Sequence, residues 1–325
     1  MSAAPVVSIV IVNYNSGDYL PRCLASVFAQ TWQDFEVIVV DNASADGSMR
    51  HLDEHPQVVQ IMNAENRGFT AGQNQGLRLA QGRYLMPLNF DIVLAPTFLA
   101  EVVSAMELGE RVGSVSGKML RMTPDGQRTD EIGNAGLLLP RRRFPVHRGG
   151  GEKDAGQYDR PALVFGAMGA AALYRREMLE DTTYRGQFFD ESYFMWYEDI
   201  DLEWRARLRG WDCVYTPGAV AYHVGDPHGH GRSKFGAETG MRNRWKMILS
   251  NECPHCLLRN APSLLAEELA LLRHVIRHGL IGAYGPAARS CLAALPATLD
   301  KRRLVRGRAM RRCLPEYPQP LEESH

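Results

Sequence analysis

Two apolar stretches near the start of the chain decide the fold: VVSIVIV at residues 6–12 and FEVIVV at residues 35–40. Both are rich in β-branched residues and end in polar loops, which is typical of buried parallel strands. Residues 19–29 between them carry apolar side chains at helical spacing. The order strand, helix, strand predicts an α/β fold with a mostly parallel sheet, continued by strands at 58–62 and 84–88 and a helix at 70–80.

Composition narrows the class of protein. The 325 residues include 37 Lys and Arg and 37 Asp and Glu, so the formal net charge is zero, which excludes a strongly basic nucleic-acid binder. Apolar residues make up 45% of the chain, enough for a sizeable core. No run of 18 apolar residues occurs, so we expect any membrane contact to be peripheral.

The cysteines predict a reducing environment. Six are scattered along the chain, and residues near the N-terminus lack the basic-then-apolar pattern of a secretory signal, so we expect a cytoplasmic protein without a disulfide framework. Cys253 and Cys256 form a CxxC pair, but no second pair follows at zinc spacing. A chance pair in a loop is therefore favoured over a metal site.

Later segments change character. Residues 119–162 gather Gly, Pro, Arg and Asp, which predicts a long mobile excursion with a solvated arginine run at 141–143. A helix is expected at 192–209. From about residue 251 the chain becomes helical and basic, with an apolar stripe (Leu265, Leu269, Leu272, Ile276) and seven Lys or Arg at 301–312. This combination suits either an anionic membrane surface or packing on the main domain.

Three groups of polar residues fall where loops gather at one edge of the sheet: Asp41 and Asp46, then Asn89 and Asp91, then Glu198 to Asp201. Each alone is explained by a helix cap or a solvated turn, but together they suggest a metal-assisted site. No GxGxxG follows the first strand, which disfavours a dinucleotide-binding enzyme. Glycines at 68, 72 and 76 indicate either tight helix packing or a phosphate-binding helix start.

Six segments in order resemble the family 2 glycosyltransferases of the GT-A fold, especially their rhamnosyltransferase-like members. The segments are VSIVIVNYN (7–15), VIVVDNASADGS (37–48), NAENRGFTAGQNQG (63–76), GRYLMPLNFDIVL (82–94), FFDESYFMWYEDIDLEWRARLRGW (188–211) and AYHVG (221–225). The resemblance covers roughly residues 6–250.

The resemblance implies an inverting, metal-dependent transfer of a sugar from a nucleoside diphosphate to a hydroxyl. Asp199 matches the acid that acts as base, with Glu198 beside it. Asp91 matches the last acid of the DxD metal motif, although Asn89 replaces the first, and His223 matches a histidine that can complete the site for Mg²⁺ or Mn²⁺; a buried structural histidine is the alternative. The residues implied in donor binding are Asn13, Asn15, Asp41, Asn66, Gly68, Asn74 and Asn89.

The expected organisation is a GT-A domain at 1–250, with a nucleotide-sugar half at 6–118 and an acceptor and catalytic half at 119–250, followed by a helical basic C-terminal appendage at 251–325. The expected partners are a dTDP- or UDP-linked sugar, with rhamnose favoured by resemblance, and a glycan or lipid-linked acceptor of cell-surface polysaccharide synthesis at the inner face of the cell membrane. A homodimer stays open. The alternatives are a catalytically silent nucleotide-sugar-binding protein and a nucleotidyltransferase, which lacks its expected Gly-rich basic loop here.

Overall fold

A computed structural model describes residues 4–225, 233–311 and 313–321. Its main sheet has the order β13-β10-β12-β6-β11-β4-β1-β2-β3, with β5 pairing β12 and β7 pairing β6. Strands β1 (Val7–Asn13), β2 (Phe35–Asp41), β3 (Val59–Met62) and β4 (Tyr84–Asn89) are parallel neighbours. The buried β-branched runs at 6–12 and 35–40 thus form the parallel part of the sheet, and the predicted α/β fold class is confirmed.

The second half of the sheet mixes strand directions. β12 (Asp212–His223) runs parallel to β6 (Val112–Met122), whereas β11 (Ala172–Arg175) lies antiparallel between β6 and β4. The shorter strands are β5 (Ile92–Leu94), β7 (Arg128–Asn134), β10 (Ala162–Val164) and β13 (Gln319–Pro320), with β8 (Leu137–Leu138) and β9 (Val146–His147) forming a separate pair.

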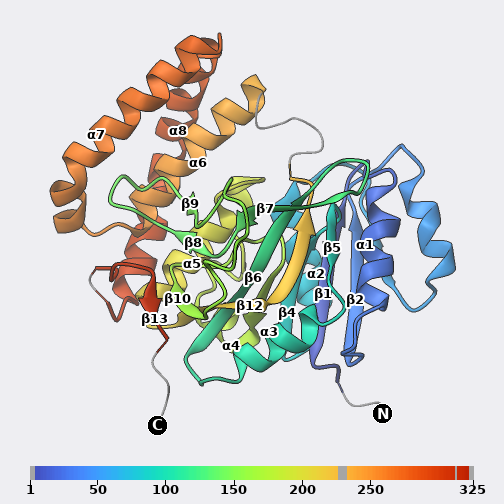
Figure 1. Cartoon of the computed structure of the whole chain (residues 1–325). Coiled ribbons are helices and arrows are strands. Elements are labelled where there is room, and N and C mark those ends of the chain that lie inside the picture. Colours follow the sequence, from blue (N-terminus) through green and yellow to red (C-terminus); the bar gives the residue numbers. More distant parts are fainter. Residues whose placement is uncertain (1–3, 226–232, 312, 322–325) are drawn as a thin grey trace.

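Helices α1 (Tyr19–Phe28), α2 (Phe69–Leu79), α3 (Phe98–Met106), α4 (Arg176–Asp181) and α5 (Glu198–Leu208) pack around the sheet (Figure 1). A Cβ added at Gly72 or Gly76 of α2 would collide with Val12 or Val10 of β1, so these two glycines allow close helix packing. For Gly72 and Gly76, the structure therefore supports tight helix packing, one of the two interpretations of the glycine stripe.

The C-terminal region is a helical layer at the opposite end of the molecule from α1 (Figure 1). It consists of α6 (Lys234–Asn251), α7 (Pro254–Arg277) and α8 (Tyr284–Gly307). None of the described helices is both long and apolar enough to cross a bilayer. Lys301 of α8 is 1% exposed in its side chain and contacts Asp190 and Asp201 at 2.7 and 2.8 Å. The helical layer is therefore joined to α5 through buried charges.

The structure corrects four expectations. Residues 119–162 are not a mobile excursion, because β6 extends to Met122 and β7 to β9 follow. Arg143 of the arginine run is buried and paired with Glu252. The expected helix at 192–209 begins at Glu198, because residues 194, 196 and 197 have left-handed backbones. The CxxC pair opens α7 instead of lying in a loop, and Cys256 forms a disulfide with Cys313.

Candidate active site

One cavity of about 990 Å³ opens at the carboxyl ends of β1, β2 and β4. It is also lined by the start of α5, the end of β12 and the segment around residue 195. Ligands of open α/β sheets bind at this edge because the loops that follow the strands meet there. The lining includes Asn66, Gly68, Asn89, Asp91, Glu198, Asp199 and His223 of the predicted site residues.

Asp91 and His223 lie together in this cavity. Register between β5 and β12 pairs His223 with Ile92, which places the histidine beside the acid that precedes β5. Nε2 of His223 lies 3.2 Å from Oδ2 of Asp91, yet it is buried and has no hydrogen-bond partner among the described residues. Oδ2 of Asp91 accepts the N–H of Gly225 at 3.0 Å. An imidazole nitrogen that has no hydrogen-bond partner and lies beside a carboxylate is available as a metal ligand together with that carboxylate.

Asn89 lines the same cavity and offers a further oxygen atom. Its Oδ1 is buried and lacks a hydrogen-bond partner within the described part of the chain. Mn²⁺ binds well to a set of carboxylate and amide oxygens with one imidazole nitrogen. Mg²⁺ binds to the oxygen atoms of such a set. The donor set therefore fits a divalent cation.

Glu198 and Asp199 belong to the first turn of α5 and line the same cavity. Oδ2 of Asp199 accepts the N–H of Gly169 at 2.9 Å, and Oδ1 accepts the N–H of Ile200 at 2.8 Å. Burial raises the pKa of Asp199, although these backbone hydrogen bonds oppose it. Burial and then the charge of Asp199 raise the pKa of Glu198 well above its usual range. Such shifts are typical of carboxylates that exchange protons near neutral pH.

Space beside Asp199 depends on Gly169. A Cβ at Gly169 would lie 2.9 Å from Cβ of Asp199 and 3.3 Å from its Oδ2. The glycine therefore lets the chain approach the carboxylate closely enough for the N–H to donate to it.

Three aromatic residues before α5 adopt left-handed backbones. The φ angles of Phe194, Trp196 and Tyr197 are 67°, 63° and 69°, a region that bulky side chains rarely occupy. All three side chains line the cavity. Backbone strain of this kind costs on the order of 1–3 kcal/mol per residue and persists only where the surroundings enforce it.

Asn243 of α6 enforces this conformation. Its Nδ2 donates to the carbonyl oxygens of Tyr193, Met195 and Trp196 at 3.0, 2.8 and 3.0 Å. Nε of Arg242 in turn donates to Oδ1 of Asn243 at 3.0 Å. The fully buried amide of α6 thus holds the aromatic segment from about 50 residues away in sequence.

Several residues implied in donor binding lie behind the cavity wall. Nδ2 of Asn13 donates to Oδ1 of Asp41 at 2.9 Å and to Oγ of Ser44 and Ser48 at 3.0 Å. Oδ1 of Asn15 accepts the N–H of Ala45 at 2.8 Å. These contacts bind the loop after β1 to the loop after β2, and Asn13, Asn15 and Asp41 do not appear in the cavity lining.

Asn74 is likewise placed outside the lining. Its Nδ2 donates to the carbonyl of Phe189 at 2.7 Å and to Oε1 of Glu191 at 3.0 Å, and its Oδ1 accepts the N–H of Phe189. The side chain joins α2 to the segment before α5. Asn66 and Gly68, by contrast, line the cavity, with the N–H of Gly68 donating to Oδ1 of Asn66 at 2.9 Å.

Sequence reasoning missed much of the lining. Asn42, which follows Asp41 directly, lines the cavity, and its Nδ2 donates to the carbonyl of Gly68 at 3.0 Å. Its place in a strand-end loop was an available signal. The remaining unpredicted lining is mostly apolar or aromatic and includes Tyr14, Leu137, Phe144, His147, Met168, Phe194, Trp196, Tyr197 and Phe235.

Several proteins of similar sequence are glycosyltransferases by name. An N-acetylglucosaminyl-diphospho-decaprenol L-rhamnosyltransferase of Mycobacterium tuberculosis is 27% identical over 259 residues, which cover 67% of this chain and 76% of that protein. An uncharacterised glycosyltransferase of Haemophilus influenzae is 28% identical over 34% of this chain. The chain spans 36% of that protein and 14% of an Escherichia coli chondroitin synthase that is 36% identical over 100 residues.

Solved structures share the fold. A mannosyltransferase of Pyrobaculum calidifontis, in complex with GDP-Man and Mn²⁺, superposes with a TM-score of 0.56 at 19% identity and covers 94% of this chain and 86% of its own. GalNAc-T7 with UDP, GalNAc and Mn²⁺ gives a TM-score of 0.61 at 16% identity, over 77% of this chain and 48% of its own. The family described as glycosyl transferase family 2 matches residues 8–183, more than half of the sequence. The chain therefore belongs to glycosyl transferase family 2.

Proposed function

We propose that the protein is an inverting glycosyltransferase that moves a sugar from a nucleoside-diphosphate donor to a hydroxyl of an acceptor. The observation that carries the proposal is that Asp91, His223, Glu198 and Asp199 all line one cavity. Inverting transfer needs a group that assists the leaving diphosphate and a base that activates the attacking hydroxyl. Asp91 and His223 are suited to the first task, and Glu198 and Asp199 to the second.

Asp91 and His223 would hold a divalent cation, Mn²⁺ or Mg²⁺, with Asn89 as a further oxygen donor. When bound, the cation supplies positive charge to the departing diphosphate. The residues themselves fix its position, since Asp91 is held by the N–H of Gly225 and His223 by the pairing of β12 with β5.

Asp199 is the proposed base. An acceptor hydroxyl is a poor nucleophile at neutral pH, so a carboxylate must accept its proton as the new bond forms. The raised pKa of Asp199 makes it a better proton acceptor than an ordinary aspartate. Glu198 is 6% exposed and, with its Oε2 buried and lacking a hydrogen-bond partner in the residues described, is the supporting acid.

The donor is proposed to be a dTDP- or UDP-linked sugar, bound over residues 6–118 near Asn66 and Gly68. The hydrogen bonds of Asn13, Asn15, Asp41 and Asn74 suit these residues to positioning the loops around the base and ribose. Rhamnose as the transferred sugar is supported by the name of the mycobacterial relative.

The acceptor is proposed to be a glycan or lipid-linked glycan held over residues 119–250. Phe194, Trp196 and Tyr197 give one side of the cavity flat apolar surfaces, which suit the hydrocarbon face of a sugar ring or a lipid chain.

The C-terminal region, residues 251–325, is proposed to bring this site to an anionic membrane surface at the inner face of the membrane. Four apolar side chains of α7 are 47–77% exposed and fall on one face of the helix (Leu258, Leu265, Leu269, Ile276). The acidic Glu267 and Glu268 of the same helix pair with Arg142 and with Arg244 of α6, respectively. Lys301 is buried, so this member of the basic run cannot contact lipid; Arg312 lies outside the described residues.

Three measurements test these proposals. A thermal-shift panel of UDP, dTDP and GDP with Mn²⁺ identifies the nucleotide, because a bound ligand raises the melting temperature, and a transfer assay with the stabilising nucleotide sugar tests activity. Binding without any transfer favours the silent nucleotide-sugar-binding protein. Flotation with anionic liposomes at low salt, comparing the wild type with Leu265→Ser, tests the membrane contact: a wild type that does not float contradicts it.

A further inference from the structure

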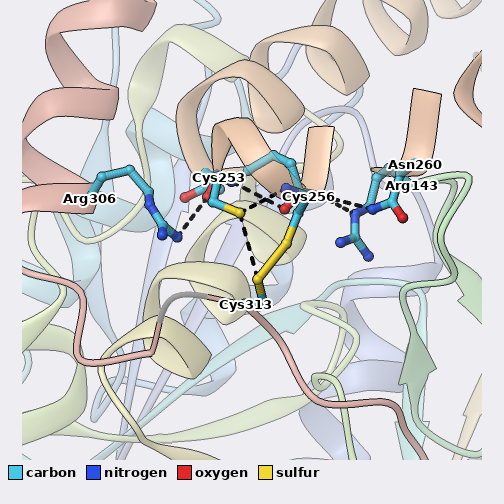
Figure 2. The surroundings of a disulfide bond; sticks show 8 residues. Arg143, Cys253, Cys256, Asn260, Arg306 and Cys313 are labelled. Carbon is cyan, nitrogen blue, oxygen red and sulfur yellow. Dashed lines mark hydrogen bonds and ion pairs between the residues drawn. A yellow bond between two sulfur atoms is a disulfide. The ribbon is translucent and has the colours of Figure 1, made fainter. Parts of the chain in front are cut away.

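Three of the six cysteines converge at a place that is not part of the cavity lining. Cys253 and Cys256 belong to the start of α7, and Cys313 lies on the segment that follows α8 (Figure 2). The three Sγ atoms all lie within 4.8 Å of one another. A disulfide joins Cys256 to Cys313, and Sγ of Cys253 lies 3.6 Å from Sγ of Cys313. A disulfide uses two thiols, so this cluster holds one sulfur more than a disulfide requires.

A helix N-terminus and two arginines lie around these sulfurs. Cys253 is the N-cap residue of the 24-residue helix α7, and its Sγ accepts the N–H of Cys256 at 3.0 Å. A helix N-terminus carries partial positive charge. Arg143 and Arg306 flank the cluster on opposite sides (Figure 2). Glu252, which directly precedes Cys253 in the sequence, is paired with Arg143 at 2.5 Å.

We propose that the reduced protein binds one thiophilic divalent cation of the Zn²⁺ class through Cys253, Cys256 and Cys313. Thiolates are the ligands that zinc prefers, and CxxC is the usual spacing for two of them. No further His, Asp or Glu side chain of the described residues shares the cluster. Water takes the fourth position, which the half-buried Cys313 leaves accessible.

The chemistry balances in two steps. A dithiol reductant gives two electrons and two protons to the Cys256–Cys313 disulfide and becomes a disulfide itself. The three thiols then release three protons as the cation binds, so the occupied site carries one net negative charge at the helix N-terminus. The disulfide and the metal-bound form are thus alternative states of the same cluster.

Metal binding here would fasten the C-terminal segment to α7. Beyond Cys313, Leu314 and Tyr317 pack against the core cluster that contains Phe165, and β13 pairs with β10. Four residues after Phe165 in the sequence, the backbone N–H of Gly169 donates a hydrogen bond to Asp199. A cation at the cysteines would therefore stabilise a layer that supports the candidate base, without taking part in transfer.

The test uses the full-length protein, reduced with an excess of dithiol that is then removed without oxygen. Titration with Co²⁺ should give a sulfur-to-cobalt charge-transfer band that saturates at about one equivalent, and Zn²⁺ should abolish the band. This band is specific for thiolate ligands, so it separates the cluster from Asp91 and His223, which contain no sulfur. Cys253→Ser and Cys313→Ser should lose it, whereas the matched control Cys291→Ser, a half-buried free cysteine elsewhere, should keep it.

A second measurement needs no variant. Zn²⁺ should protect Cys253, Cys256 and Cys313 of the reduced wild-type protein from alkylation, as determined by peptide mapping, while Cys291 stays reactive. Binding should also raise the melting temperature of the reduced wild type more than that of Cys313→Ser, which keeps only the proposed cation site at Asp91 and His223. A reduced protein with no charge-transfer band and no protection of these three cysteines would overturn the proposal, and so would a band of wild-type strength in Cys313→Ser.

Discussion

Two regions around the cavity are held in place in different ways. We call the loops after β1, β2 and β4 the donor side, and α5 with the segment before it the acceptor side. On the donor side, the loops after β1 and β2 are joined by hydrogen bonds among Asn13, Asp41, Ser44 and Ser48, all within 35 residues of one another. On the acceptor side, the segment before α5 is held by Asn243 of α6, and α5 itself by Lys301 of α8. The donor side is thus a local structure, whereas the acceptor side depends on distant helices. Variants can test each side separately.

The largest effect is expected on the donor side at Asp91. Asp91→Ala should abolish metal-dependent nucleotide binding, because it removes the acid beside His223. His223→Ala should weaken it less. Titration of Mn²⁺ against nucleotide binding measures both, with the exposed Asp53→Ala as control. If Asp91→Ala kept the metal dependence of the wild type, Asp91 would not be part of the metal site. If only His223→Ala kept it, His223 would be a structural histidine and not a metal ligand.

Lys301→Met should destabilise the acceptor side by about 3–5 kcal/mol, because it leaves the buried carboxylates of Asp190 and Asp201 without their shared cation. Burial acts to raise the pKa of both acids, but the charge of Lys301 and other cations holds each pKa below its usual value. Their contribution to stability is therefore present above the unfolded pKa and lost as the pH falls through the folded pKa.

Urea unfolding at neutral and acidic pH measures this. The difference between wild type and Lys301→Met should shrink on acidification, and the exposed neighbour Arg303→Met should unfold like wild type. Equal stability of the two variants at neutral pH would show that the buried charges contribute nothing.

Asp199→Asn should lower turnover by roughly 10²-fold or more, the scale of losing a general base, with nucleotide affinity nearly intact. Glu198→Gln is the matched comparison and should have the smaller effect on turnover. A transfer assay combined with calorimetric titration of the nucleotide separates the two quantities. Turnover close to wild type in Asp199→Asn would contradict its assignment as base.

The pH profile of kcat/KM should show an acidic limb set by Asp199. Because burial raises its pKa, the base becomes protonated at a higher pH than an ordinary aspartate, and activity should fall about tenfold for each pH unit below that pKa. Glu198, Glu203 and Tyr174 are charged or titratable neighbours that couple to it. Activity that stays constant down to the usual aspartate range would contradict the raised pKa.

The smallest effect compares two asparagines. Asn243→Ala should lower kcat a few-fold at nearly constant donor KM, and should cost about 1–3 kcal/mol of stability, because three carbonyls lose their shared donor. Asn63→Ala removes contacts to Asn42 and Gln75 on the donor side and should raise donor KM instead. If both variants change the same kinetic constant, the two sides are not independent.

Prediction from sequence succeeded where structure is local. The runs at 6–12 and 35–40 carry their own strand signal, and the strand-end position of Asp91 follows from the apolar YLMPL before it. The start of α5 could not be predicted, because nothing in FMWY indicates that Phe194, Trp196 and Tyr197 adopt left-handed backbones that Asn243 enforces. The partners of Asp201 and Cys256 could not be predicted either, because each is distant in sequence. Lys301 is 100 residues from Asp201, and Cys313 is 57 residues from Cys256.

The ion triad of Lys301, Asp190 and Asp201 has a consequence for recombining this protein with its relatives. A hybrid that joins residues 1–250 to the C-terminal helices of another family member would bring together a pair of acids and an unrelated α8. Unless that helix offers a cation at the corresponding position, the two buried carboxylates would lose the cation that they share and keep only Arg205 and Lys246 as partners. Exchange of acceptor preference by grafting is therefore expected to succeed only when these three residues travel together or are replaced together by apolar ones.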